Sequence, residues 1–150
     1  MTDRIFSLVG LLAALGWLPL ALLPRRRWAE VVGGRVVPAL LAAVYAAIIA
    51  AKWGQSPGGF SSLAAVSELF ESRWLLLAGW VHYLAFDLFV GSWMVADARE
   101  RGIAHGWVLP LLPLTILFGP VGWLSYLGLR AVLGARTRAQ GIRKRARALA

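Results

Sequence analysis

Long apolar runs make up most of the chain, and short polar or charged clusters separate them. Four runs stand out by their length: residues 5–23, 36–51, 74–96 and 107–133. A helix needs roughly 20 apolar residues to cross the hydrocarbon layer, so the second run is marginal and the other three are long enough. The pattern predicts an all-α integral membrane protein, a bundle of four transmembrane helices in a single membrane domain over residues 1–134.

The stretch between the second and third runs has a different pattern. Pro57, Gly58 and Gly59 signal a turn, and a serine at 61 or 62 can cap a following helix. The apolar residues of this helix recur at helical spacing: Leu63, Val66, Leu69 and Phe70. The segment is too short to span, so we expect a short interfacial helix over residues 61–71.

Alanine recurs at every fourth position of the second run, in two parallel ladders. One ladder is Ala39, Ala43, Ala47 and Ala51, and the other is Ala42, Ala46 and Ala50. Small side chains at this spacing let two helix backbones approach closely. We expect this helix to pack tightly inside the bundle, and its small-residue faces also suit a homodimer.

The composition fits a membrane protein and excludes several kinds of site. Hydrophobic residues make up 59% of the chain, and 16 basic residues against 7 acidic ones give a net charge of +9. The basic residues cluster beside the apolar runs, as at 25–27 and 136–147, which is typical of contact with anionic lipid headgroups rather than nucleic acid. Cysteine is absent, so disulfides, thiolate metal sites and cysteine nucleophiles are excluded.

Four spans would place both termini on one side of the membrane. That side carries more of the basic residues, including a basic tail over 135–150, so we predict cytoplasmic termini. The three arginines at 25–27, directly after the first span, favour the opposite orientation. The short chain, rich in alanine, arginine and leucine, further indicates a bacterial inner membrane.

Two ionisable residues interrupt the third run, in "GWVHYLAFDLFVGSW" at 79–93. An aspartate at the centre of an inserted helix costs about 2.5–3.5 kcal/mol, so Asp87 needs a compensating role. Either a protonated Asp87 holds two helices together, or Asp87 and His82 mark a proton-transfer or ligand-anchoring site, and we favour the second reading. On a straight helix the two side chains point about 140° apart, so they cannot form one hydrogen-bonded dyad. Asp97 lies on the same face of this helix as His82, at the end of the run.

Counting from the loop after the third run places part of the fourth run opposite Asp87. This residue lies ~15 Å deep, level with Leu117 and close to Thr115 and Pro120. Because Pro120 cannot donate a hydrogen bond to the carbonyl of Ile116, that carbonyl needs another donor, and a protonated Asp87 would serve.

The same count places His82 opposite the later part of the fourth run, with Trp123, Ser125 and Tyr126 as expected neighbours. The candidate site residues in and directly after the third run are His82, Asp87 and Asp97. The candidate ligand-binding residues around them are Trp80, Tyr83, Phe86, Trp93, Thr115, Pro120, Trp123 and Tyr126. We predict no metal site, and haem ligation by His82 and His105 is disfavoured because one lies in a span and the other in a loop.

The chain from Gly58 to Arg130 resembles the abscisic-acid-deficient-four-like family, membrane proteins associated with neoxanthin synthesis in plants. The matching stretches are "GGF.S" at 58–62, "AGWVHYLAFDLFVG.W" at 78–93, Asp97 with Ala98, "LP.L" around Pro110 and Pro113, and "LFGPVG" followed by "LR" at 117–130. The resemblance implies a four-span bundle that handles a long polyene.

The resemblance also implies a reaction. The plant reaction associated with the family isomerises an epoxy-carotenoid to an allenic one, in which an epoxide opens while a proton leaves a neighbouring carbon. Such a step needs an acid and a base but no redox cofactor, and His82, Asp87 and Asp97 are the positions to carry it. The alternative is a non-catalytic membrane module that binds a carotenoid, a retinoid or a lipid, or a partner membrane enzyme.

Overall fold

The structure is a computed structural model that describes residues 1–55 and 57–148, with side chains described as far as Gly134. Every regular element in these residues is helical. The elements are α1 (Thr2–Leu22), α2 (Arg27–Val31), the π-helix η1 (Val32–Val36), α3 (Val37–Lys52), the 3₁₀-helix η2 (Trp53–Gln55), α4 (Leu63–Glu71), α5 (Arg73–Glu100), α6 (His105–Val108), α7 (Leu111–Phe118) and α8 (Pro120–Ala148). The predicted all-α fold is therefore confirmed for the described residues.

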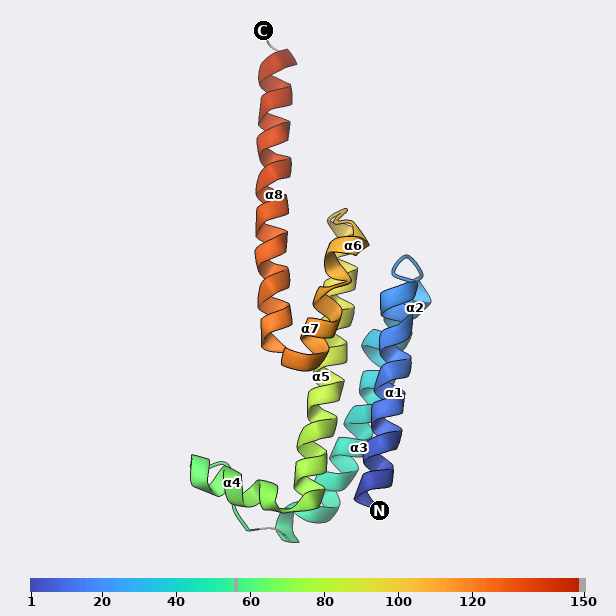
Figure 1. The fold of residues 1–150 in the computed structure, drawn as a ribbon, viewed down its shortest axis with the longest axis vertical. Helices are drawn as coiled ribbons and strands as arrows, with labels where there is room; N and C mark the ends of the chain where they lie inside the picture. Colours follow the sequence, from blue (N-terminus) through green and yellow to red (C-terminus); the bar gives the residue numbers. More distant parts are fainter. Residues whose placement is uncertain (56, 149–150) are drawn as a thin grey trace.

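Three helical stretches are long and apolar enough to cross a membrane: Thr2–Leu22, Arg27–Gln55 and Arg73–Glu100. Within them, α1, α3 and α5 run side by side as a bundle (Figure 1). The second stretch is longer than the predicted run of 36–51, because η1 joins α2 to α3 without a break.

Glycines let these three helices approach closely. A Cβ atom at Gly33 would lie 2.7 Å from the Leu20 side chain, and one at Gly34 would collide with Ser92 on α5. A Cβ atom at Gly91 would collide with the Trp17 ring. The tight contacts between α1, η1 and α5 therefore depend on residues without a side chain.

The predicted role of the alanine ladders inside the bundle is wrong. All seven alanines are exposed, because α3 turns the opposite face inward and buries Val37, Leu41 and Ile48. These larger side chains provide more apolar contact than alanine. A homodimer through the exposed ladders stays a prediction.

The fourth predicted span is not one helix. The chain breaks at Gly119, which has a φ of 31°, between the end of α7 at Phe118 and the start of α8 at Pro120. Figure 1 shows α7 running down beside α5 to about its middle, where the chain reverses and α8 returns to the side from which α7 came. Residues 105–134 thus form a re-entrant hairpin. The prediction of a single span over 107–133 is wrong, and the four-span count is not confirmed.

The reversal has a local cause. Pro120 has no backbone N–H, so it cannot continue the hydrogen-bond ladder of α7, and Gly119 takes up a positive φ at no steric cost. Two adjacent residues therefore stop one helix and turn the chain.

The predicted short helix before the third span is present as α4. The Ser62 side chain accepts a hydrogen bond from the backbone N–H of Ala65 at 3.1 Å, so the predicted serine cap is confirmed. Figure 1 shows α4 projecting sideways from the lower end of α5, at the same end of the bundle as the N-terminus. Its location at a membrane interface stays a prediction, and the side chains of the predicted basic tail, 135–150, lie outside the described residues.

The hairpin changes the expected topology. Because α8 returns, its C-terminal end lies at the opposite end of the bundle from the N-terminus (Figure 1). The N-terminal end carries the basic residues Arg4, Lys52 and Arg73, and the α6 end carries Arg25, Arg26, Arg27, Arg35, Arg99, Arg101 and Arg130. The second set is the larger, so the positive-inside rule favours the α6 end as the cytoplasmic one.

We therefore predict an external N-terminus and a cytoplasmic C-terminus. The chain has no cysteine, so single cysteines can report the side directly. In bacterial cells, Ser61→Cys should react with a membrane-impermeant maleimide, whereas Ala104→Cys should react only after permeabilisation. A reporter fused to the C-terminus should show the same cytoplasmic location as Ala104→Cys. A reporter on the same side of the membrane as Ser61→Cys would instead support the four-span topology.

Candidate functional site

Asp87 lies in the middle of α5, under the tip of the hairpin. Its side chain is buried, and a Cβ atom at Gly119 would stand only 2.8 Å from its Oδ1 atom. The predicted match in depth between Asp87 and the "FGP" segment is therefore confirmed. The Oδ2 atom is also buried, and it has no hydrogen-bond partner among the described residues. The site thus contains a carboxyl group with an unused oxygen in an apolar setting.

Tyr83 connects α5 to the tip of the hairpin. Its hydroxyl donates a 2.5 Å hydrogen bond to the carbonyl of Ile116, the group that Pro120 leaves without a partner. The prediction of Asp87 as this donor is wrong. Tyr83 takes the role because it precedes Asp87 by one helical turn on the same face, and its longer side chain reaches the carbonyl. Tyr83 and Asp87 are also close enough to interact electrostatically.

Tyr83→Phe should therefore destabilise the protein. The change leaves the Ile116 carbonyl without a donor, which costs about 1–3 kcal/mol for a buried group. We expect a lower free energy of unfolding for the purified protein, measured in detergent by denaturant titration. Tyr45→Phe is the matched control, because the Tyr45 hydroxyl makes no hydrogen bond to the described residues. Equal stability of the two variants would contradict this role of Tyr83.

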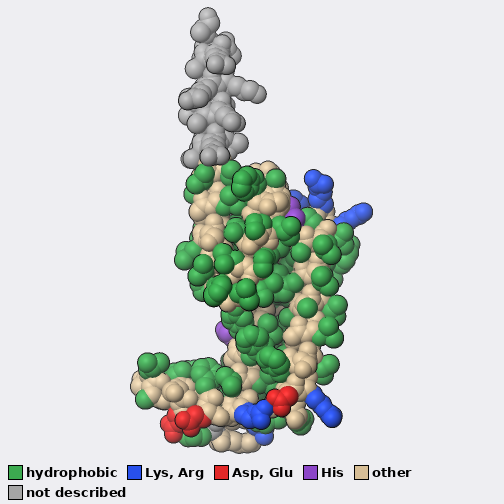
Figure 2. Space-filling view, viewed as in Figure 1, with side chains coloured by type: hydrophobic (Ala, Val, Ile, Leu, Met, Phe, Trp, Pro, Cys, Tyr) green, Lys and Arg blue, Asp and Glu red, His purple; other side chains and the backbone are tan. Residues whose placement is uncertain are grey.

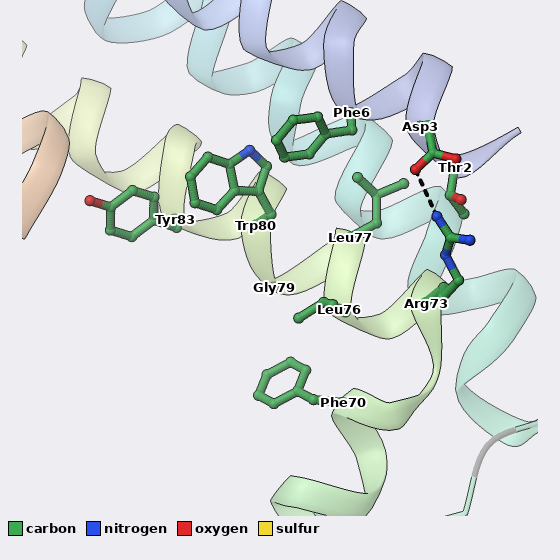
Figure 3. A pocket seen from close by; sticks show the side chains of 10 residues that line it. All are labelled: Thr2, Asp3, Phe6, Phe70, Arg73, Leu76, Leu77, Gly79, Trp80 and Tyr83. Carbon is green, nitrogen blue, oxygen red and sulfur yellow. Dashed lines mark hydrogen bonds and ion pairs between the residues drawn. The ribbon is translucent and has the colours of Figure 1, made fainter.

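An apolar groove leads to Tyr83 along α5. It has a volume of about 510 Å³ and lies between the start of α1, the end of α4 and the first half of α5 (Figure 3). The side chains that form its walls are Phe6, Phe70, Leu76, Leu77, Trp80 and Tyr83. Trp80 packs between two of these rings, with centroids 5.5 Å from Phe6 and 5.4 Å from Tyr83. The groove therefore offers an aromatic wall.

An ion pair marks the other end of the groove. Arg73 and Asp3 lie 2.7 Å apart and are both well exposed (Figure 3). From Arg73 to Tyr83 the groove follows ten residues of α5, or ~15 Å. It thus runs from a polar pair at the end of the bundle to the residue that adjoins Asp87.

His82 faces a different cavity. The imidazole stacks on Phe86, with centroids 4.6 Å apart, and approaches Tyr45 at 5.6 Å. It lines a cavity of about 280 Å³ between α3, α4 and α5. His82 and Asp87 therefore share no site, in agreement with the helical geometry. The predicted contact of His82 with Trp123, Ser125 and Tyr126 is wrong, because α8 turns away at Gly119.

Asp97 links α5 to α8. Its carboxylate accepts a 2.6 Å hydrogen bond from the Tyr126 hydroxyl and 2.9 Å bonds from Nε of Arg101, and Nε of Arg130 lies 3.6 Å away. The Trp93 ring meets Tyr126 edge-on at 5.7 Å. Asp97 is ten residues from Asp87, or ~15 Å along the helix. The three candidate catalytic residues thus occupy three separate places. The contacts of Asp97 hold α8 of the hairpin against α5.

The other candidate ligand-binding residues divide into three groups. Trp80 and Tyr83 line the groove. Thr115 is buried within the hairpin, where it donates to the carbonyl of Leu111 at 2.8 Å, while Phe86, Pro120 and Trp123 are exposed. In the described part of the chain, no group of three or more histidine, aspartate or glutamate side chains is arranged to hold a metal ion.

The contribution of α1 to the groove does not follow from the sequence. Phe6 and Asp3 come from the first span, and the sequence gives no sign that this helix packs beside Trp80. One signal in the sequence could have paired α1 with α5. Asp3 and Arg73 carry opposite charges, and their segments are predicted to lie on the same side of the membrane.

The fold fits an all-helical membrane protein in which a re-entrant hairpin covers a buried carboxyl group. The family model described as ABA DEFICIENT 4-like matches residues 4–126, most of the chain. The chain belongs to this family, and the match includes the first two spans, which lie before the residues that carry the resemblance. No curated protein and no solved structure matches the chain significantly.

Proposed function

We propose that this protein binds a long polyene, a carotenoid or a related isoprenoid, in the groove along α5 and isomerises it by acid–base chemistry at Asp87. One observation carries the proposal. A buried carboxyl oxygen of Asp87 lacks a hydrogen-bond partner among the described residues, and the neighbouring Tyr83 lines the groove. An ionisable side chain inside the membrane marks a functional site by default.

The groove suits a conjugated chain. Its walls are almost entirely apolar, and the rings of Phe6, Trp80 and Tyr83 can stack against an extended π-system. Leu76 and Trp80 are 56% and 40% exposed, so in a membrane the groove opens towards the lipid. The Asp3–Arg73 pair at its outer end offers hydrogen-bonding groups to a hydroxylated end-group. A molecule with an apolar body and polar ends fits this arrangement.

The proposed reaction needs one proton donor and acceptor. The Asp87 carboxyl group gives its proton to the epoxide oxygen as the carbon–oxygen bond breaks. The resulting carboxylate removes a proton from the neighbouring carbon, the electron pair forms the new double bond, and the carboxyl group is restored. Substrate and product have the same composition, so the step consumes no oxidant or reductant. Tyr83 holds the hairpin tip over the reacting groups through Ile116.

A second candidate function is binding without chemistry. None of the three residues expected to act as acid or base lines the groove: Asp87 lies next to Tyr83, which does, while His82 lines another cavity and Asp97 is held by Tyr126 and Arg101. This separation favours a module that binds a carotenoid, a retinoid or a lipid, or presents one to a partner membrane enzyme.

The groove itself can be tested in carotenoid-producing cells. Leu76→Trp should fill the groove and remove most of the pigment that co-purifies with the wild-type protein, together with any change in the cellular pigment profile. Leu40→Trp is the matched control, because Leu40 is 50% exposed on α3 and lies outside the groove. Pigment content measured by absorbance per mole of protein gives the result. An unchanged pigment content in Leu76→Trp would contradict the groove as the pigment-binding site.

A further inference from the structure

A second, larger cavity lies at the opposite end of the bundle from the groove. It has a volume of about 830 Å³ and lies between the end of α1, the end of α5 and the start of α6. Its wall includes three arginines and one histidine: Arg25, Arg26, Arg99 and His105. Figure 2 shows basic side chains gathered beside a histidine at this end of the molecule. We refer to it as the basic cavity.

The positive charge of the basic cavity is only partly neutralised. Arg99 pairs with Glu30, with one Nη2–Oε2 distance of 3.0 Å. Arg25 and Arg26 form no ion pair with any residue that the structure describes. No acidic side chain lines the cavity within that same part of the chain. Two arginines of the cavity wall are therefore without a counter-charge among the described residues.

The wall of the basic cavity is held in place from two sides. Nε2 of His105 donates a 2.9 Å hydrogen bond to the carbonyl of Ala21, which ties the start of α6 to the end of α1. The Arg99–Glu30 pair ties the end of α5 to α2. The cavity thus lies between the ends of three helices and the two loops that adjoin them, and these contacts tie its parts together.

The depth of the basic cavity identifies its ligand. The membrane-spanning helices α1 and α5 end here, at Leu22 and Glu100, which is the level of the lipid headgroups. The remaining wall is apolar, with Leu22, Val95 and Ile103, and this suits the upper part of an acyl chain. Arginine binds phosphate oxygens through paired, charge-assisted hydrogen bonds. We propose that the basic cavity binds the phosphate headgroup of an anionic membrane lipid, which joins α6 and the hairpin to the three-helix bundle.

The test compares lipids on the purified full-length protein. Short-chain phosphatidylglycerol should raise the melting temperature of the wild-type protein in detergent, and phosphatidylcholine with the same chains should not. In Arg25→Gln/Arg26→Gln, the apparent Kd for phosphatidylglycerol should rise at least about tenfold, since two charge-assisted contacts are lost. Gly106→Leu should weaken binding without a change in charge, because the position lines the cavity and an added Cβ meets no atom within 4 Å.

The matched control removes equal charge outside the cavity. Arg27→Gln/Arg35→Gln changes two exposed arginines near the same end that do not line the cavity, and it should keep the wild-type affinity. An equal loss in this control would show a diffuse charge effect and overturn the proposal. Equal stabilisation by inorganic phosphate alone would assign the cavity to a free anion and overturn the lipid as ligand. Equal stabilisation by the two lipids would also overturn it.

Discussion

Asp87→Asn is expected to abolish carotenoid conversion while the protein keeps its fold. The amide has the size of the carboxyl group but cannot give and regain a proton, and loss of a general acid–base group lowers a rate by about 10²–10⁴-fold. Stability should change little, because Oδ2 of Asp87 makes no hydrogen bond to the described residues that the substitution could break. The measurement is the pigment profile of carotenoid-producing cells, resolved by chromatography and normalised to the amount of protein in the membrane.

Two further variants serve as controls for Asp87→Asn. Glu100→Gln makes the same chemical change at an exposed position of the same helix and should leave conversion intact. His82→Ala should also retain conversion, because His82 lines a different cavity. Full conversion by Asp87→Asn would refute the acid–base role. Co-purified pigment without conversion in the wild type would support the binding module instead.

Gly119→Ala is expected to displace the hairpin tip and lower the free energy of unfolding by at least about 2 kcal/mol. The residue has a φ of 31°, where a side chain costs about 1–2 kcal/mol, and the new Cβ atom would stand 2.8 Å from Oδ1 of Asp87. Denaturant unfolding in detergent measures the loss, and pigment conversion should fall with it. Gly128→Ala, in α8, is the matched control, since a Cβ atom there meets nothing within 4 Å.

A double-mutant cycle separates the two causes. In an Asp87→Ala background the Cβ atom of Gly119→Ala no longer meets the carboxyl oxygen, so the destabilisation should shrink to the backbone component. An undiminished effect would mean that the carboxyl group does not lie against the tip. Unchanged stability of Gly119→Ala in the wild-type background would contradict the reversal of the chain at this residue.

The local features of this fold follow from the sequence. The three crossing helices are visible as apolar runs, α4 follows from the spacing of Leu63, Val66 and Leu69, and its cap follows from Ser62. The depth of Asp87 relative to the "FGP" segment follows from counting residues away from a short loop. Each of these depends on residues that are near in sequence.

The reversal at Gly119 could not be predicted in the same way. A glycine before a proline in an apolar run is compatible both with a kinked span and with a turn. Contacts distant in sequence decide between them: Tyr83 holds Ile116, and Asp97 holds Tyr126. The exposed position of the alanine ladders could not be predicted for a similar reason, since the face of α3 that turns inward depends on the shape of α1 and α5.

The hairpin reaches only half-way along α5, and this makes the two halves of the bilayer unequal for the protein. Beside the later half of α5, from Asp87 to Glu100, α7 and α8 take the place of acyl chains. Beside the earlier half, where the groove lies, no part of the hairpin covers Leu76 and Trp80, and both side chains are exposed. A dissolved polyene is therefore expected to reach the groove from one leaflet alone, the one that contains the N-terminus, and a molecule confined to the other leaflet would first have to flip.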